Sequence, residues 1–253
     1  MLTPEHLVLA AFAACLVLSC LLPFLTGPVR MKFRSWQAAD PVYTADDDSR
    51  LPGRARFAAE ELRALGFENL GTWRHDGAAR ATGWVILLQH PRTLDVAQVM
   101  VVAAGRRRVV SLLLMTRFAD GAEALTFNSP VVVGFPLPPG ITAAWLPEVR
   151  SAAALYRIHV QLRDALRGAG GLGSRVVPDP AGFLRNRSAR VLAAWVEGGY
   201  YAVDEQRGIV RPTWKGAVLI TWRLLWPVKP MYRAGRRRAT RQLLEHLGVA
   251  LDP

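Results

Sequence analysis

The side chains best suited to acid–base or metal chemistry in this sequence are five histidines, and their spacing points to no site. None is spaced with another His, Cys or Glu in the way that metal ligands are. The pattern predicts His90 at the end of a strand and His159 on a helix that is apolar nearly all round, where a structural histidine is the commoner case. The full set is His6, His75, His90, His159 and His246.

Other catalytic signatures are missing from the sequence as well. It holds no nucleophile elbow, no phosphate loop and no paired-carboxylate pattern. We therefore expect no catalytic residue, no cofactor and no metal ligand, and we expect that the protein is not an enzyme. An enzyme whose site is assembled only in space stays open as an alternative, because the members of a catalytic triad need not be close in sequence.

Three further motifs invite a functional interpretation, and each has a plainer explanation. The stretch GAGGLG at 168–173 matches G-x-G-x-x-G, but it follows a predicted helix and leads into an extended segment, so a flexible linker is favoured. The acidic run at 46–48 has no second ligand cluster, which favours a solvated tether. The Arg106–Arg108 cluster could bind anions, although a charged, solvated hairpin turn is the commoner explanation.

Positive charge is concentrated in the C-terminal third of the chain. The net charge is +12, and residues 175–253 hold 14 Lys and Arg against 6 Asp and Glu. This asymmetry indicates that the C-terminal part contacts something anionic, either lipid headgroups or nucleic acid.

An uncharged stretch near the N-terminus predicts a membrane span. It runs from Leu7 to Val29, and its 23 residues are long enough to cross a hydrocarbon core of about 30 Å. Basic residues follow it at Arg30, Lys32 and Arg34. Because positive charge stays in the cytoplasm, we expect a bacterial inner-membrane protein with its N-terminus outside and the bulk of the chain cytoplasmic.

Two other interpretations of this stretch are less favoured. A cleaved signal peptide would need a basic start and a shorter apolar core. A lipoprotein site at VLSC, residues 17–20, would need a polar sequence after Cys20, where the apolar run continues. Cys15 and Cys20 both lie in the apolar run, so the rest of the chain has no cysteine and cannot form disulfides. This is what we expect of a cytoplasmic domain.

The elements between residues 54 and 168 predict one α+β domain. A helix at 54–66, ending at Gly66, precedes five strand-like runs that should form an antiparallel sheet of about five strands. A proline-rich stretch after Ser129 predicts a long extended loop, and a helix follows at 147–168. The predicted organisation is an anchor at 1–34, a linker at 35–53, the α+β domain at 54–168, a Gly-rich linker at 169–178 and a basic C-terminal region at 179–253.

The C-terminal region predicts a helix, a β-hairpin and further helices. The first helix spans 179–199 with Asp179 as its N-cap, the hairpin turns near Gly208, and the next helix starts after Thr213. Helix, hairpin and the step PTWKG together resemble the helix and wing of winged-helix regulators over about 40 residues. The resemblance implies a nucleic-acid-binding function in which Arg185 and Arg190 lie on the reading helix. The overall layout resembles uncharacterised bacterial single-pass membrane-anchored proteins.

The tryptophan-rich stretch at 212–233 predicts a short helix beside a basic cluster. From Gly216 to Val228 it has only 13 residues with Arg223 near the middle, which is too short and too charged to span a membrane. Tryptophans beside basic residues are typical of the headgroup zone, so we expect membrane-surface contact. Plain core packing and nucleic-acid binding stay open as alternatives. The expected contact residues are Trp214, Trp222, Arg223, Trp226, Lys229, Arg233, Arg236, Arg237, Arg238 and Arg241.

The function predicted from these observations is interaction or scaffolding. A membrane-anchored protein would present a cytoplasmic domain and a basic, Trp-rich C-terminus that contacts the bilayer. Its partners would be the lipid bilayer through Leu7–Val29 and anionic headgroups, with a protein partner unknown. The alternative is a membrane-tethered nucleic-acid-binding regulator of the winged-helix type.

Overall fold

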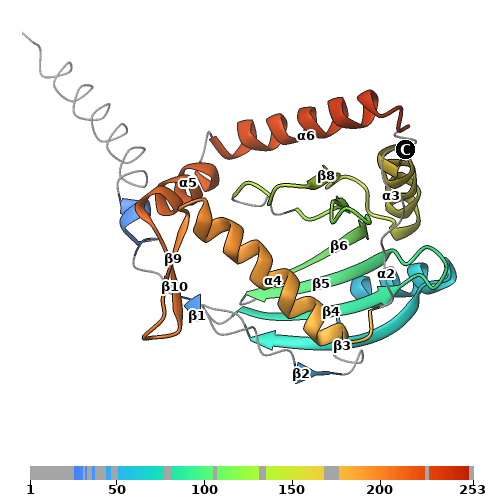
Figure 1. The fold of residues 1–253 in the computed structure, drawn as a ribbon, viewed down its shortest axis with the longest axis horizontal. Helices are drawn as coiled ribbons and strands as arrows, with labels where there is room; N and C mark the ends of the chain where they lie inside the picture. The colour runs from blue at the N-terminus through green and yellow to red at the C-terminus, as the bar shows by residue number, and fades with distance from the viewer. Residues whose placement is uncertain are drawn as a thin grey trace, which may run out of the picture. The chain divides into compact units, whose positions relative to one another are not determined.

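The chain folds into two compact units, each made of segments that are distant in sequence. The sheet unit comprises residues 39–133, 137–194 and 233–253, and the hairpin unit comprises residues 1–38, 134–136 and 195–232. Figure 1 shows the elements of both units in a computed structural model. The structure describes residues 26–30, 32, 36–37, 44–46, 51–76, 81–104, 107–130, 135–167, 177–225 and 228–250.

The sheet unit is built on a mixed sheet of seven strands in the order β2-β3-β4-β5-β6-β7-β8. All neighbours pair antiparallel except β7 and β8, which are parallel. The α+β class is therefore confirmed, and the predicted antiparallel sheet of about five strands is corrected to a mixed sheet of seven. The strands are β2 (Thr44–Ala45), β3 (Glu68–Asp76), β4 (Ala81–Gln89), β5 (Val96–Ala104), β6 (Arg107–Arg117), β7 (Glu123–Phe127) and β8 (Ile141–Trp145).

The central strands are apolar on both faces because both faces are covered. In β4, Ile86 and Leu88 join one buried cluster, while Val85 and Leu87 join another. Helices α2 (Gly53–Ala64) and α3 (Ala152–Leu166) pack on the first face, and the N-terminal part of α4 (Pro180–Glu197) packs on the second. Alternating side chains that are buried on both sides explain why these strands show continuous apolar runs.

The helix boundaries follow from capping groups. Gly66, with φ of +92°, ends α2 as predicted. The Oδ1 of Asp179 accepts a hydrogen bond from the Gly182 N–H at 2.9 Å, as expected of the N-cap of α4. Helix α3 begins later than predicted, after Ser151, because the Ser151 hydroxyl accepts from the Ala154 N–H and caps the helix there.

Strand β8 lies inside the stretch that was predicted to be only a loop. The prolines end at Pro139 and resume at Pro147, which leaves seven proline-free residues, and five of these pair with β7. Helix α6 (Val228–His246) contributes residues 233–246 to the sheet unit, and its Thr240 hydroxyl accepts a hydrogen bond from the Trp145 N–H at 3.1 Å. A side chain of α6 thus satisfies a backbone donor of β8.

The hairpin unit holds a three-stranded antiparallel sheet and helix α5. The predicted hairpin is confirmed, with Gly208 at φ +59° in its turn, and Thr213 caps α5 by accepting from the Gly216 N–H at 3.1 Å. A Cβ on Gly216 would lie 2.0 Å from the carbonyl oxygen of Tyr200, so only glycine permits α5 to pack this closely. The elements are β1 (Trp36–Gln37), β9 (Tyr201–Asp204), β10 (Ile209–Pro212) and α5 (Trp214–Leu224).

The expected membrane span and the localisation built on it need correction. Within the ranges that the structure describes, no helix combines the length and the apolar character needed to cross a membrane. Of the expected span Leu7–Val29, residues 7–25 lie outside the described residues, and residues 26–30 are helical. The structure therefore contradicts the prediction of a single-pass bacterial inner-membrane protein with an outside N-terminus and a cytoplasmic remainder.

Candidate functional site

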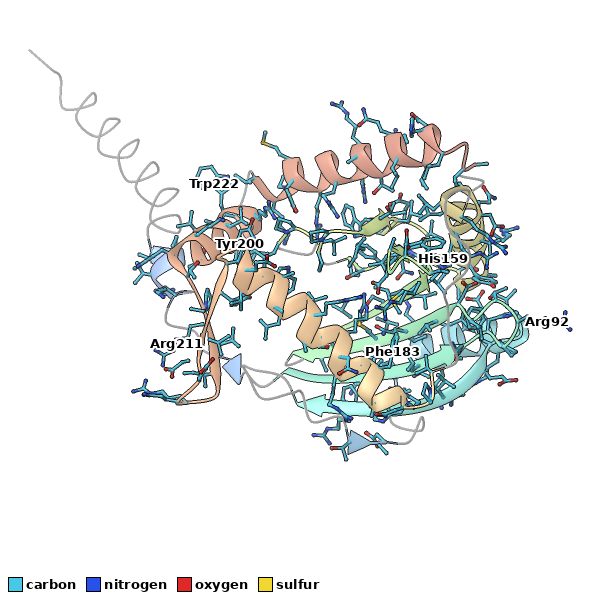
Figure 2. The ribbon with its side chains drawn as sticks, viewed as in Figure 1. Arg92, His159, Phe183, Tyr200, Arg211 and Trp222 are labelled. Carbon is cyan, nitrogen blue, oxygen red and sulfur yellow. The ribbon has the colours of Figure 1, made fainter. Side chains whose placement is uncertain are left out.

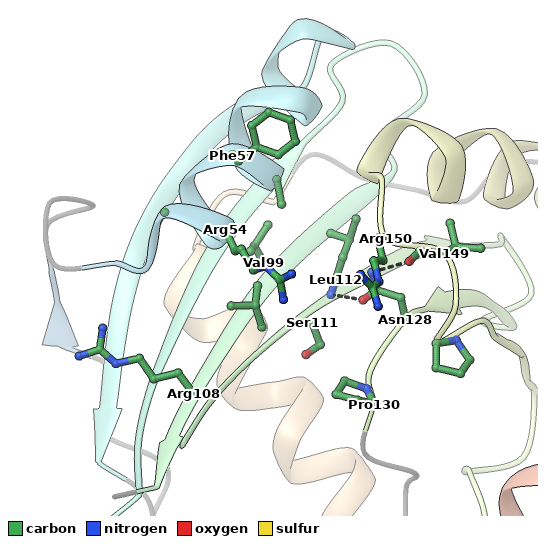
Figure 3. A pocket seen from close by; sticks show the side chains of 14 residues that line it. Arg54, Phe57, Val99, Arg108, Ser111, Leu112, Asn128, Pro130, Val149 and Arg150 are labelled. Carbon is green, nitrogen blue, oxygen red and sulfur yellow. Dashed lines mark hydrogen bonds between the residues drawn. The ribbon is translucent and has the colours of Figure 1, made fainter. Parts of the chain in front are cut away.

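A concave feature of the described residues is a pocket in the sheet unit, between α2, strands β5 and β6, and the segment before α3. It has a volume of about 590 Å³. Figure 3 shows Arg54 of α2 and Arg150 of the segment before α3 on opposite sides of the pocket, with Arg108 at the start of β6. The apolar part of the lining is formed by Phe57, Ala58, Val99, Val110, Leu112, Pro130, Pro147 and Val149.

The start of α2 contributes backbone N–H groups to this pocket as well as the side chain of Arg54. Gly53 and Arg54 form the first turn of the helix and line the pocket. Pro52 stands at the N-cap and offers no side-chain hydrogen bond to the first backbone N–H groups. The positive end of the helix dipole therefore points to the same region as the guanidinium of Arg54, and both favour an anion.

Asn128 ties the segment before α3, which carries Arg150, to strand β6. Its Oδ1 accepts a hydrogen bond from the Leu112 N–H at 2.7 Å, and its Nδ2 donates to the Val149 carbonyl at 2.9 Å. These bonds, drawn in Figure 3, hold the segment next to Arg150 against strand β6. The position of Arg150 is therefore set by backbone contacts that do not involve its own charge.

The electrostatics of the pocket are one-sided. Arg54, Arg108 and Arg150 are exposed, no Asp or Glu lies among the described residues of the lining, and none of the three has an ion-pair partner in the described part of the chain. The same lining contains no His, Cys, Lys or Tyr, and its Ser111 has no base beside it. The arrangement can hold an anion but offers no general acid or base.

The sequence identified only part of this site. Of the Arg106–Arg108 cluster, Arg108 lines the pocket, whereas Arg106 lies outside the described residues. Arg54 and Arg150 were missed because they are far apart in the chain and each starts or precedes a helix, with no local motif around it. Only the packing of α2 and the segment before α3 on the same sheet face brings them together.

The sheet unit also contains a cluster of polar side chains around Asp95. This cluster is buried, so it is not open to a ligand. Asp95 is fully buried, and its Oδ2 accepts from Arg163 at 2.7 Å, from Thr93 at 2.7 Å and from Tyr156 at 3.2 Å. Its Oδ1 accepts from the Thr116 hydroxyl. Burial raises the pKa of the Tyr156 phenol. These bonds join the start of β5 and the end of β6 to α3, so the cluster stabilises the fold.

His159 extends this network under α3 (Figure 2). The Thr116 hydroxyl donates to Asp95, so its oxygen accepts from Nε2–H of His159 at 3.0 Å, and Nδ1 accepts from Thr126 at 3.1 Å. This pattern needs a neutral imidazole. Burial lowers the pKa of His159 to about 4, with the charge of Arg163 acting in the same direction and that of Asp95 against it. The structural role expected for His159 fits this position.

The tryptophans that the sequence singled out lie in the hairpin unit and point outward. Trp214 and Trp222 on α5 are 54% and 52% exposed. The guanidinium of Arg223 lies 4.3 Å from the centre of the Tyr232 ring, and Lys229 is exposed. Trp226 lies outside the described residues. The alternative of plain core packing is thus wrong for the first two tryptophans.

The remaining predicted contact residues lie on α6, within the sheet unit. Arg233 donates to the Pro130 carbonyl at 2.8 Å, and Arg237 lies 3.7 Å from the carboxylate of Glu148. Arg236 is half-buried, and Arg238 and Arg241 are exposed. The structure therefore divides the predicted set between two units.

Two arginines of the proposed reading helix contact side chains on the strands of the sheet unit. Arg190 forms an ion pair with the buried carboxylate of Glu123, and Arg187 donates to Gln98 at 3.4 Å. Arg185 lies 3.6 Å from Asp179, with both side chains exposed. This side of α4 faces the sheet through those contacts.

No known protein family, curated protein or solved structure matches this chain. The winged-helix resemblance therefore stays a prediction. In the parts of the chain that the structure describes, no three His, Cys, Asp or Glu side chains gather as metal ligands would. The pocket geometry is thus the main support for a function.

Proposed function

We propose that this protein is a binding protein whose sheet unit takes an amphipathic anion, a carboxylate or phosphate attached to an apolar body. The observation that carries the proposal is the pairing of three arginines with an apolar wall in one pocket, whose described lining contains no carboxylate. The volume of about 590 Å³ lies inside the range of about 300–1,000 Å³ for small-molecule sites.

The two parts of such a ligand have distinct places in the pocket. Arg54, Arg150 and the start of α2 would bind the charged group, because guanidinium forks donate paired hydrogen bonds to carboxylate and phosphate. The apolar body would lie on Val99, Val110 and Leu112, which displaces water from apolar surface. The described lining holds no acid–base pair, so we propose binding alone for this pocket. That the protein is not an enzyme stays a prediction.

Isothermal titration calorimetry with octyl phosphate tests the proposal, and octanol serves as the uncharged control ligand. We expect octyl phosphate to bind and octanol to bind at least about tenfold more weakly, because charge-assisted hydrogen bonds contribute about 1.5–3 kcal/mol. Arg54→Ala should weaken binding of octyl phosphate by about tenfold or more. The affinity should also fall as salt rises, since the arginines are exposed.

Arg56→Ala is the matched control. Arg56 is an exposed arginine on the same helix, two residues after Arg54, and it does not line the pocket. The proposal predicts that this variant binds octyl phosphate like the wild type. Equal losses in the two variants would mean that general positive charge, and not this pocket, attracts the ligand, and that result would contradict the proposal.

A further inference from the structure

Helix α5 of the hairpin unit presents an apolar face outward. Trp214, Val218 and Trp222 are spaced by four residues, so they lie in one row along the helix, and all three are exposed. Figure 2 labels Trp222 on α5. Another side of α5 is used for packing, through the buried residues Gly216, Ala217 and Thr221.

The packed side of α5 has identifiable neighbours within the hairpin unit. Gly216 lies against the backbone of Tyr200, and Gly27 lies so close to Thr221 that a Cβ would be 2.3 Å from its methyl group. The hairpin and residues 26–30 thus hold one face of the helix. The row of Trp214, Val218 and Trp222 lies on a different face. These side chains are therefore exposed on a helix that is packed against its own unit.

The stretch of chain that carries this row is basic. Residues 206–232 contain no Asp or Glu. Lys215 lies beside the row on the helix surface, with its ammonium group 4.5 Å from the centre of the Tyr200 ring and exposed to solvent. The five basic residues of this stretch are Arg207, Arg211, Lys215, Arg223 and Lys229. A partner for this face should therefore be apolar at its centre and anionic around it.

We propose that α5 docks on an anionic lipid surface, with Trp214, Val218 and Trp222 in the zone between headgroups and acyl chains. The helix has 11 residues, a length of about 16 Å, so it would lie in the plane of the surface and not cross it. Indole rings favour this zone because they are apolar with one polar N–H, and basic residues beside them attract anionic headgroups. Duplex DNA is the less favoured partner, because the exposed face of α5 presents more apolar than basic side chains. This inference is independent of the pocket.

Brominated lipids give a local test with the full chain, because bromine quenches tryptophan fluorescence only at short range. The vesicles contain brominated phosphatidylcholine and phosphatidylglycerol in equal parts. We expect quenching of the wild type, and loss of most of that quenching in the double variant Trp214→Phe, Trp222→Phe. Phenylalanine keeps an aromatic side chain at two positions that are about half exposed, so the variant should fold.

The control is Trp84→Phe. Trp84 is half-buried on β4 in the sheet unit and donates to Asp46 at 3.0 Å, so its removal should leave the quenching unchanged. Vesicles of brominated phosphatidylcholine alone should quench the wild type much less. Equal quenching of the double variant and the wild type would overturn the proposal, as would equal quenching by neutral and anionic vesicles, no quenching at all, or binding of duplex DNA without binding of vesicles.

Discussion

Replacing Asp95 with Asn is expected to lower the free energy of unfolding by about 3–5 kcal/mol. The substitution keeps the size of the side chain but removes its charge. The guanidinium of Arg163, whose side chain is 8% exposed, would then lie beside a neutral amide at a depth where water cannot compensate. Urea unfolding at neutral pH measures the change.

Asp164→Asn is the matched control for that experiment. Asp164 accepts from the Nε of the same Arg163 at 2.9 Å, but its side chain is 51% exposed. An ion pair with an exposed partner contributes little, so the expected loss is below about 1 kcal/mol. Similar losses in the two variants would show that burial of Asp95 does not set the strength of its interaction, contrary to the structure.

The second large effect is a loss of stability between pH 6.5 and pH 4 that depends on His159. Above pH 6.5 the imidazole is neutral in both the folded and the unfolded chain. Burial lowers the pKa of His159 to about 4 in the folded state, against 6.5 when unfolded, so between these values only the unfolded chain takes up a proton. The free energy of unfolding should therefore fall by about 3 kcal/mol from this group as pH decreases through that window.

The variant His159→Gln isolates this contribution, because glutamine does not titrate. We expect it to be less stable than the wild type at pH 7, since it cannot reproduce both hydrogen bonds to Thr116 and Thr126. The difference in unfolding free energy between the two proteins should then shrink by about 3 kcal/mol as the pH is lowered to 4. If the unfolding free energies of the two proteins changed in parallel with pH across this range, His159 would not be buried in the neutral form.

Much of the fold was predictable because its signals are local. The runs that became β3–β7 alternate or are continuously apolar, and residues such as Gly66, Asp179 and Thr213 end or cap helices through their own side chains or backbone freedom. Strand β8 was missed because its pairing depends on β7 and the prolines on both sides of it argue against a strand. Strand β2 has only two residues, too few to form a pattern.

The candidate site was far less predictable, for a physical reason. Arg54 and Arg150 carry no motif, and their shared surroundings exist only because α2 and the segment before α3 lie on one face of the sheet. The buried cluster of Asp95, Arg163 and His159 is also invisible in the sequence, since its members come from a strand end and a helix. The exposure of Trp214 and Trp222, by contrast, agrees with the outward-facing role that the sequence suggested for them.

A crystal structure of the protein with octyl phosphate is the most direct test of the central claim, that the arginine-lined pocket binds an amphipathic anion. The account predicts phosphate oxygens at about 2.7–2.9 Å from the guanidinium groups of Arg54 and Arg150, with the octyl chain against Val99 and Leu112. Octyl phosphate bound elsewhere on the sheet unit, with the pocket empty at a saturating concentration, would contradict it.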